Sequence, residues 1–380
     1  MNTSRTSSDT ALDAVAVASG YDVAIFGGGP AGLAVAIELT RQGLDVLVIE
    51  RSDYAAERVG EHLPPGAKRQ LRAVGIADPL DSGRHVACHG IRSVWGRTEP
   101  YDKDYIAHPD GAGLNLTRPD FDLRLATVAS GLGVTVVTQS RLATLTRDGV
   151  WQISLVRHRR QLDIRADMLI DATGRSASIA KRLGARPIAY DRLVALVGRT
   201  KAAEDDDATV LIEAVENGWW YSAGLANGAV VATFLSDHDL LPLSEGERAT
   251  AWLQALQSAK YTVARCPRLL AMENLVVRTA RTQCLSTAAG EGWLATGDAA
   301  MSFDPLSSEG ISKAFAWATY AADATLNWRR GDRQSLQRYD EKVETTFVEY
   351  LRLRHTYYRV EKRWPDAPFW ARRRMPPRPV

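Results

Sequence analysis

The stretch Tyr21-Asp22-Val23-Ala24-Ile25-Phe26-Gly27-Gly28-Gly29-Pro30-Ala31-Gly32 decides the fold. Its first six residues form a short apolar run that stops at three glycines, which is typical of a buried strand followed by a turn. Pro30–Gln42 then has helical spacing, and proline suits the first helical turn. A second apolar run, Asp45–Glu50, predicts another strand. The sequence therefore predicts a βαβ unit that begins at Tyr21.

The glycine turn fits the pattern G-x-G-x-x-G, and each glycine has its own physical reason. Gly27 permits the tight turn, Gly29 lets a pyrophosphate approach the backbone, and Gly32 lets helix and strand pack closely. The helix then points free N–H groups and a partial positive charge at the phosphates. Glu50 lies 23 residues after Gly27, near the position expected for a carboxylate that binds ribose hydroxyls. These features together predict a dinucleotide site.

Length and composition are typical of a soluble globular protein. With 380 residues, two joined domains are expected. The net charge of +2 gives no argument for nucleic acid or membrane as a partner, and no apolar run is long enough to span a bilayer. The first twenty residues do not resemble a secretory signal. Cys88, Cys266 and Cys284 lack the spacing of metal ligands, so we expect packing residues in a reducing cytoplasm and no metal.

The pattern changes after residue 190. Four strands joined by short turns are expected between Leu193 and Leu235, which favours an antiparallel sheet. The chain then returns to the first domain at Gly292–Thr296, and two long helices are expected over Glu309–Arg329 and Asp332–Lys362. The predicted class is α/β (α+β): a Rossmann-type domain, an inserted antiparallel-sheet substrate domain and C-terminal helices. The expected boundaries are 1–20 disordered tail, 21–190 with 275–330 dinucleotide domain, 191–274 substrate domain and 331–380 C-terminal helix with basic tail, while loops around 76–113 contribute to the substrate site.

Two later segments favour FAD over NAD. One is Asp171-Ala172-Thr173-Gly174-Arg175, and the other is Gly297-Asp298-Ala299-Ala300 followed by Asp304-Pro305-Leu306-Ser307-Ser308-Glu309-Gly310-Ile311. Asp298 can accept hydrogen bonds from ribityl hydroxyls. A helix that begins at Gly310 offers N–H groups where a reduced flavin gathers negative charge.

These motifs resemble the halogenase-like branch of the FAD-dependent monooxygenases. The chain is most similar to the flavoproteins that mature lysine ε-oxidase and quinohemoprotein amine dehydrogenase by oxidising a tryptophan of a partner polypeptide. The matching segments lie between residues 21 and 373, and the segment 113–118, where relatives tend to have Trp and His, departs from the pattern. The matches are Arg58-Val59-Gly60-Glu61-His62-Leu63-Pro64-Pro65, Gly174-Arg175, Gly218-Trp219-Trp220-Tyr221-Ser222, Gly297–Ile311 and Arg363-Trp364 with Phe369-Trp370.

The resemblance, together with the motifs, implies a set of site residues. Glu61 and Glu309 are candidate catalytic carboxylates, although each could equally be structural: Glu61 in its loop and Glu309 as charge compensation at a helix start. Trp219 and Tyr221 are candidates for the substrate pocket, but alternate residues of a strand can also simply pack in the core. The expected FAD-binding residues are Gly27, Gly29, Pro30, Ala31, Gly32, Glu50, Arg51, Arg118, Ala172, Thr173, Gly174, Asp298, Pro305, Gly310 and Ile311.

The resemblance also narrows the chemistry. Reduced flavin and oxygen give a C4a-hydroperoxide, which can hydroxylate an aromatic ring or be intercepted by halide. Only Trp219 survives of the halogenases' Trp-x-Trp-x-Ile-Pro segment, and their lysine segment has no counterpart between Ala77 and His108, where Lys103 lies among charges. Hydroxylation of a peptide-bound tryptophan is therefore favoured, with reduced FAD from a separate reductase because only one dinucleotide fingerprint is present. A flavin-dependent halogenase and a flavin-binding maturation chaperone remain the alternatives.

The C-terminal residues allow two interpretations. Between Arg352 and Arg378 the sequence combines Tyr357, Tyr358, Trp364, Phe369 and Trp370 with many arginines. Arginine and aromatic residues are enriched where proteins dock on one another, so this segment is a candidate docking surface for a peptide substrate. Equally, it can be a helix packed on the domain and followed by a solvated basic tail.

Overall fold

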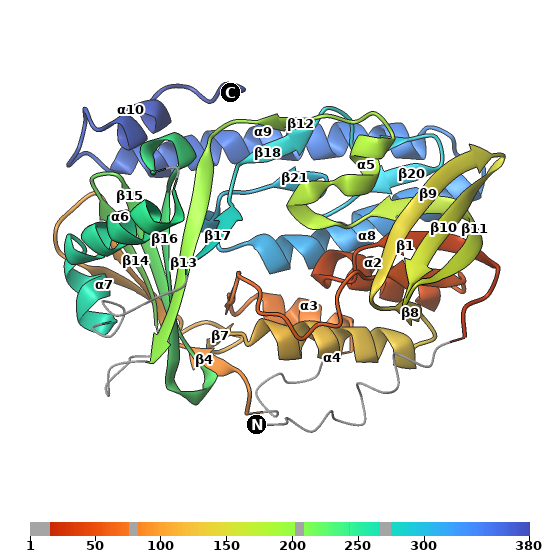
Figure 1. Ribbon diagram of the computed structural model, residues 1–380, viewed down its shortest axis with the longest axis horizontal. Coiled ribbons are helices and arrows are strands. Elements are labelled where there is room, and N and C mark those ends of the chain that lie inside the picture. Colours follow the sequence, from red (N-terminus) through yellow and green to blue (C-terminus); the bar gives the residue numbers. More distant parts are fainter. Residues whose placement is uncertain (1–15, 76–82, 202–208, 243, 267–274) are drawn as a thin grey trace.

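A computed structural model describes residues 16–75, 83–201, 209–242, 244–266 and 275–380. Most of the expected N-terminal tail and part of the expected substrate loop, residues 76–82, therefore lie outside the described residues. The described chain forms two large sheets and two small ones. Figure 1 shows the large sheets at opposite ends of the molecule, with the long helix α9 (Ser335–Val360) running along both.

The first large sheet contains the predicted βαβ unit. β1 (Gly20–Phe26) pairs in parallel with β2 (Val46–Ile49) on one side and with β11 (Arg160–Asp171) on the other. The sheet order is β19-β20-β11-β1-β2-β8, and β9 and β10 continue from β11 as an antiparallel extension. The remaining strands are β8 (Thr135–Val137), β9 (Ser140–Asp148), β10 (Val150–Arg157), β19 (Ala289–Gly290) and β20 (Trp293–Ala295).

Helices cover this sheet with small, closely packed side chains. α2 (Pro30–Arg41) is buried along Gly32–Ile37 and packs against α8 (Gly310–Arg329), while α4 (Arg118–Gly131) lies beside α2. The alanines of α2 and α8 let these helix backbones approach closely. The other helices of this part are α3 (Ala67–Ala73) and α5 (Ser178–Arg182).

The second large sheet has the order β17-β13-β16-β15-β14-β5-β6. Two features differ from the expected antiparallel sheet of residues 191–274. β5 pairs with β14 in parallel, because the segment around residue 90 enters from the other domain, and β17 belongs to this sheet although it follows residue 274. The strands are β5 (Gly90–Val94), β6 (Tyr101–Asp104), β13 (Leu193–Lys201), β14 (Val210–Val215), β15 (Gly218–Leu225), β16 (Ala229–Asp237) and β17 (Val276–Thr279).

The two faces of this sheet bury different clusters. Trp220 of β15 points to the outer face, where it packs against Phe234 and Trp252 of α6 (Glu245–Gln257), and α7 (Lys260–Arg265) lies beside α6. Trp219 points to the inner face, because successive side chains of a strand alternate. The inner face looks toward the rest of the molecule.

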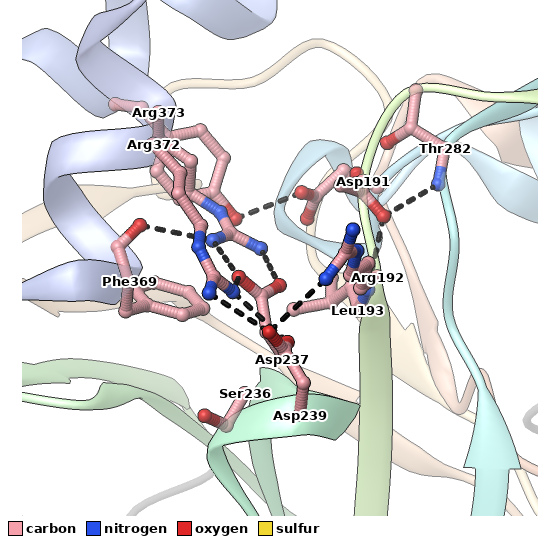
Figure 2. Close-up of polar contacts among 12 residues, drawn as sticks. Asp191, Arg192, Leu193, Ser236, Asp237, Asp239, Thr282, Phe369, Arg372 and Arg373 are labelled. Carbon is pink, nitrogen blue, oxygen red and sulfur yellow. Dashed lines mark hydrogen bonds and ion pairs between the residues drawn. The ribbon is translucent and has the colours of Figure 1, made fainter. Parts of the chain in front are cut away.

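The C-terminal segment closes the inner face. Phe369 and Trp370 of α10 (Pro368–Arg374) are buried in the cluster that contains Trp219, and the Trp370 indole N–H donates to the carbonyl of Val215. Figure 2 shows Arg372 and Arg373 reaching Asp237 at the end of β16. The interpretation as a solvated basic tail is therefore wrong for α10, because Arg372 and Arg373 are paired with Asp237. The interpretation as a docking surface is wrong for Phe369 and Trp370, because both side chains are buried in the core.

Two three-stranded sheets connect the large ones. β3 (His62–Leu63), β7 (Gly113–Asn115) and β4 (Val86–Cys88) form one, and β12 (Pro187–Ala189), β18 (Gln283–Leu285) and β21 (Met301–Ser302) form the other. Among the helices of the described residues, none has both the length and the apolar character that a membrane span requires.

Candidate functional site: a dinucleotide cradle between two sheets

The cradle forms at the carboxyl ends of four adjacent parallel strands, β20, β11, β1 and β2. The segments that follow these strands contain Asp298, Ala172–Gly174, Gly27–Gly29 and Glu50. Ligands of open α/β sheets bind at this edge. The fold thus brings together four of the motifs that the sequence singled out.

The glycine turn has the shape that a phosphate needs. Gly27 adopts φ +108°, and a Cβ there would lie 2.2 Å from the carbonyl oxygen of Ala172. A Cβ at Gly32 would lie 2.0 Å from the carbonyl oxygen of Gly27. At Gly29, by contrast, a Cβ would meet nothing within 4 Å, and this residue caps α2 without any side-chain bond to the helix N–H groups. The turn therefore leaves open space in front of free backbone donors, which fits the pyrophosphate of FAD.

Glu50 is buried at the end of β2, with 5% of its surface exposed. Its Oε2 accepts a hydrogen bond from the N–H of Gly28 at 2.7 Å, and its Oε1 accepts from the hydroxyl of Ser52 at 2.6 Å. Tyr54 supports the same turn, because its hydroxyl donates to the carbonyl of Gly28 at 2.9 Å. Glu50 is thus held rigidly, and Oε2 keeps acceptor capacity for a ribose hydroxyl. Arg51 is exposed beside it.

Residues 171–174 form the opposite wall of the turn. The N–H of Ala172 donates to the carbonyl of Phe26 at 2.8 Å, and Gly174 adopts φ +67°. Asp171 is fully buried and accepts from the hydroxyl of Thr173 and from the first N–H groups of α5. Asp171 therefore holds the loop in its conformation through these hydrogen bonds. From the sequence alone, this structural role could not be told apart from a contact with the ligand.

The turn at Gly297-Asp298 lies against the start of α2. A Cβ at Gly297 would come within 2.6 Å of the Cβ of Ala31, so only glycine fits. The Asp298 carboxylate lies 2.8 Å from the ammonium of Lys313 and 3.5 Å from the guanidinium of Arg175. Burial opposes the ionisation of Asp298, but the charges of Lys313 and Arg175 outweigh it and lower its pKa. Asp298 is therefore an ionised acceptor beside the glycine turn.

The start of α8 completes the set of FAD candidates. Pro305–Ser307 forms a 3-10 turn capped by Asp304, Ser308 is left-handed with φ +52°, and Gly310 then begins α8 without a side-chain cap. The Ser312 hydroxyl in the first turn of α8 is buried and has no hydrogen-bond partner among the described residues. Free N–H groups and an unpaired hydroxyl at one helix start fit the polar edge of a flavin ring. Ile311 is buried there, and Glu309 and Pro305 are exposed.

Glu61 lies in a loop that side chains of β13 and α4 hold in place. It is 2% exposed, and its carboxylate lies 3.2 Å from Arg199 of β13. Arg118 of α4 donates to the carbonyls of Val59 and Gly60, and it also pairs with Asp122. Most donors of Arg118 are thus already used by the protein, so it supports this loop, and the FAD contact expected of it stays a prediction. Burial raises the pKa of Glu61, and Arg199 counteracts part of that rise.

Tyr221 faces Glu61 from the inner side of the second large sheet, whereas Trp219 does not line an open space. The Tyr221 hydroxyl is buried, and no well-formed hydrogen bond to another described residue satisfies it. Its pKa is raised by burial and by the nearby Glu61 carboxylate. Trp219 is completely buried, donates its indole N–H to the Tyr358 hydroxyl and packs against Trp95. The expectation that Trp219 lines the pocket is therefore corrected to a packing role, and Tyr221 stays a candidate.

Sequence reasoning missed several residues of this region. Tyr54, Lys313 and Arg199 contact motif residues that lie 26, 15 and 138 positions away in the sequence, so no local pattern marks them. Glu309 is exposed at the start of α8, where partial removal from water raises its pKa. Within the described ranges, no three His, Cys, Asp or Glu side chains come together as a metal site would require.

Comparison with known proteins places this cradle in a family. The chain is 29% identical over 360 residues to the putative FAD-dependent oxidoreductase LodB of Marinomonas mediterranea, covering 93% of this chain and 96% of that protein. It is 23% identical to a pyrrole-carbonyl carrier-protein brominase of Pseudoalteromonas luteoviolacea, with 80% and 77% covered.

Solved structures share the fold. The myxobacterial halogenase CndH superposes with a TM-score of 0.84 at 19% identity, covering 94% of this chain and 86% of that one. The peptidyl tryptophan dihydroxylase QhpG superposes with a TM-score of 0.78 at 26% identity, covering 93% and 78%. The sequence profile of the FAD binding domain family matches residues 20–343. With its glycine turn, Glu50 and Asp298 at one sheet edge, this chain belongs to the FAD binding domain family, is an FAD-dependent oxidoreductase and shares its fold with a flavin-dependent halogenase.

Proposed function

We propose that the protein is an FAD-dependent monooxygenase that hydroxylates an aromatic ring, namely a tryptophan side chain in a peptide or small protein. The observation that carries this proposal is the likeness to a peptidyl tryptophan dihydroxylase over 93% of the chain at 26% identity. The nearly full-length likeness to LodB, a putative FAD-dependent oxidoreductase, supports the flavin-dependent redox part of the proposal. The proposed reductant is FAD reduced by a separate reductase, because the sequence has one dinucleotide fingerprint.

The chain's own residues have separate tasks in this proposal. FAD, when bound and reduced, supplies the two electrons with which one oxygen atom of O2 enters the ring and the other leaves as water. The Gly27–Gly32 turn binds the pyrophosphate, Asp298 and Glu50 accept hydrogen bonds from hydroxyls, and the start of α8 donates to the ring edge. The remaining members of the proposed set are Pro30, Ala31, Arg51, Arg118, Ala172, Thr173, Gly174, Pro305, Gly310 and Ile311.

Glu61 is the proposed base for the ring proton that hydroxylation displaces. A buried carboxyl with a raised pKa can accept a proton near neutral pH more readily than an exposed one. Arg199 keeps the carboxylate in one orientation at 3.2 Å, and the Tyr221 hydroxyl opposite has an unused hydrogen-bonding capacity. Glu309 is the second proposed carboxylate, at the exposed start of α8.

The halogenase alternative requires an amine that can take up an oxidised halogen. Lys103 lies on the exposed edge strand β6, and Lys313 is the one lysine that is buried within the described residues. The Lys313 ammonium is bound to Asp298 and to the carbonyl of Met301 at 2.5 Å, so it is not free to react. These positions favour hydroxylation over halogenation.

Mass spectrometry of the product tests the proposal. A tryptophan-containing polypeptide encoded beside the gene, and free tryptophan, are each incubated with the protein, reduced FAD, oxygen and bromide. We expect oxygen and no bromine in the polypeptide, with kcat/KM at least about tenfold above that of free tryptophan, because remote binding energy aligns the ring.

The other outcomes each point to an alternative. A brominated product would establish halogenation. An unchanged polypeptide that nevertheless binds the protein tightly would favour a maturation chaperone. Equal kcat/KM for the polypeptide and for free tryptophan would contradict the peptide substrate. The Gly29→Val variant is the control, because it lacks room for the cofactor.

A further inference from the structure

Lys313 is a buried cation in the first turns of α8. Its side chain is 4% exposed, whereas every other lysine of the chain keeps greater exposure. The ammonium contacts the Asp298 carboxylate at 2.8 Å and the carbonyl of Met301 at 2.5 Å, and it lies 4.2 Å from the centre of the Phe303 ring. These contacts satisfy the ammonium from within the protein, so it is a fixed group and not a mobile one.

Burying the Lys313 ammonium costs free energy of desolvation, which an apolar side chain of similar size would not incur. A methionine would fill similar space in a helix without taking a charge out of water. Removal from water lowers the pKa of Lys313, and the Asp298 carboxylate counteracts part of that loss. A buried ion pair adds little to the stability of a protein, so stability alone does not explain the pair of Lys313 and Asp298. The surroundings of Asp298 indicate what the pair does.

Asp298 differs from Lys313 in exposure. Its side chain keeps 31% of its surface, so the carboxylate has one side toward Lys313 and another open. The turn that carries it touches Ala31 at the start of α2, where the glycine cradle lies. Lys313 therefore holds Asp298 from behind, and the open side of the carboxylate lies at the cradle.

Arg175 approaches the second carboxylate oxygen of Asp298. Its guanidinium lies 3.5 Å from Asp298, and it also donates to the carbonyl of Phe303 at 2.7 Å. Two cations around one carboxylate leave a net positive charge beside the place proposed for the pyrophosphate. They also leave Asp298 as an acceptor whose direction is fixed by groups on two different elements.

We propose that Lys313 is a positioning residue for FAD: it fixes Asp298 in the orientation and charge state that binds the cofactor's ribityl hydroxyls. This inference rests on the proposed role of Asp298. It predicts that Lys313 acts through Asp298 and not by direct contact with the cofactor or through folding alone.

A double-mutant cycle on FAD affinity tests this prediction. The Kd for FAD is measured by fluorescence titration for the wild type, Lys313→Met, Asp298→Asn and the double variant. Each single change is expected to raise Kd by about tenfold, and the double variant is expected to resemble Asp298→Asn, because residues in contact do not add. Lys313→Arg should recover part of the affinity.

Two results would overturn the inference. One is an unchanged Kd in Lys313→Met, and the other is an additive cycle in which the double variant loses about 100-fold. The Tm of each cofactor-free variant shows whether it folds. If Lys313→Met does not fold, Lys313→Gln, which keeps a donor for Met301, takes its place in the cycle. The cycle measures affinity and not turnover, so failed hydroxylation leaves it valid, whereas a wild type that binds no FAD contradicts the cofactor site itself.

Discussion

At the scale of single residues, Gly29 is the position of the glycine turn where a side chain would meet open space, whereas a side chain at Gly27 or Gly32 would clash with the backbone. Replacing Gly29 with valine puts branched methyl groups in the open space in front of the α2 N–H groups. Losing two charge-assisted hydrogen bonds, each worth about 1.5–3 kcal/mol, should raise the Kd for FAD at least about 100-fold. Gly131→Val is the matched control, because Gly131 is also open and lies at the end of α4, away from the cradle. A folded Gly29→Val protein with wild-type affinity would refute the site.

His62 makes a second prediction at this scale. It is buried in β3, where its ring nitrogens lie 3.2 Å from the Tyr105 hydroxyl and 3.4 Å from the Asn115 side chain. Removal from water lowers the pKa of His62 to about 4. The unfolded chain, whose histidine titrates near 6.5, binds the proton more strongly. The contribution of the neutral ring is therefore complete above pH 6.5 and is lost as the pH falls toward 4.

This pH dependence can be measured directly. Between pH 6.5 and 4 the free energy of unfolding should fall by up to about 3 kcal/mol through His62, and His62→Gln should remove that part of the slope. Chemical unfolding at several pH values gives the comparison. An identical slope in the variant would show that His62 stays accessible to protons in the folded protein.

The sequence predicted the residues that follow a local pattern and missed those that depend on distant contacts. Gly27, Gly29, Glu50 and Asp298 follow strand ends, Gly32 lies in the first turn of α2, and the structure gathers these residues at one edge of the sheet. Supporting residues such as Lys313 carry no such signal, because their partners come from another element. For Trp219 the motif could be recognised, but its burial could not be predicted. The residues that cover it belong to a segment much later in the chain.

At the scale of elements, α10 is held by charge as well as by apolar packing. Arg373 is 3% exposed, as is Asp237, and their closest atoms are 2.7 Å apart. Arg372 pairs with the same carboxylate and with Asp239 at 2.8 Å, as Figure 2 shows. The inner face of the second large sheet is therefore covered by the short helix α10, for whose residues the sequence allowed two interpretations.

Removing Arg373 should destabilise the protein markedly. In Arg373→Met, Asp237 keeps only the more exposed Arg372, and breaking a buried pair in this way costs about 3 kcal/mol. The free energy of unfolding from urea titration checks this value. Arg378→Met, a change at an exposed arginine, should stay within about 0.5 kcal/mol of the wild type. A similar small effect for Arg373→Met would mean that Trp370 and Phe369 alone hold α10.

At the scale of the whole molecule, the fold class could be predicted and the assembly of the second large sheet could not. The four strands expected between Leu193 and Leu235 correspond to β13, β14, β15 and β16. β5, β6 and β17 joined them from outside the expected range, because strand pairing between distant segments leaves no periodic trace in either segment. The two long helices expected over Glu309–Arg329 and Asp332–Lys362 correspond to α8 and α9, but the sequence did not indicate which sheet each helix covers.

The burial of Trp219 under Tyr358 and Trp370 also constrains the order in which parts of the protein can fold during translation. About 150 residues separate the strand from the helix that covers it, which at 5–20 residues per second corresponds to roughly 8–30 s of translation. During that interval the inner face of β15 has no permanent cover, while the βαβ unit at the N-terminus already has β1, α2 and β2. The inner core of the second large sheet therefore closes only when α10 has left the exit tunnel.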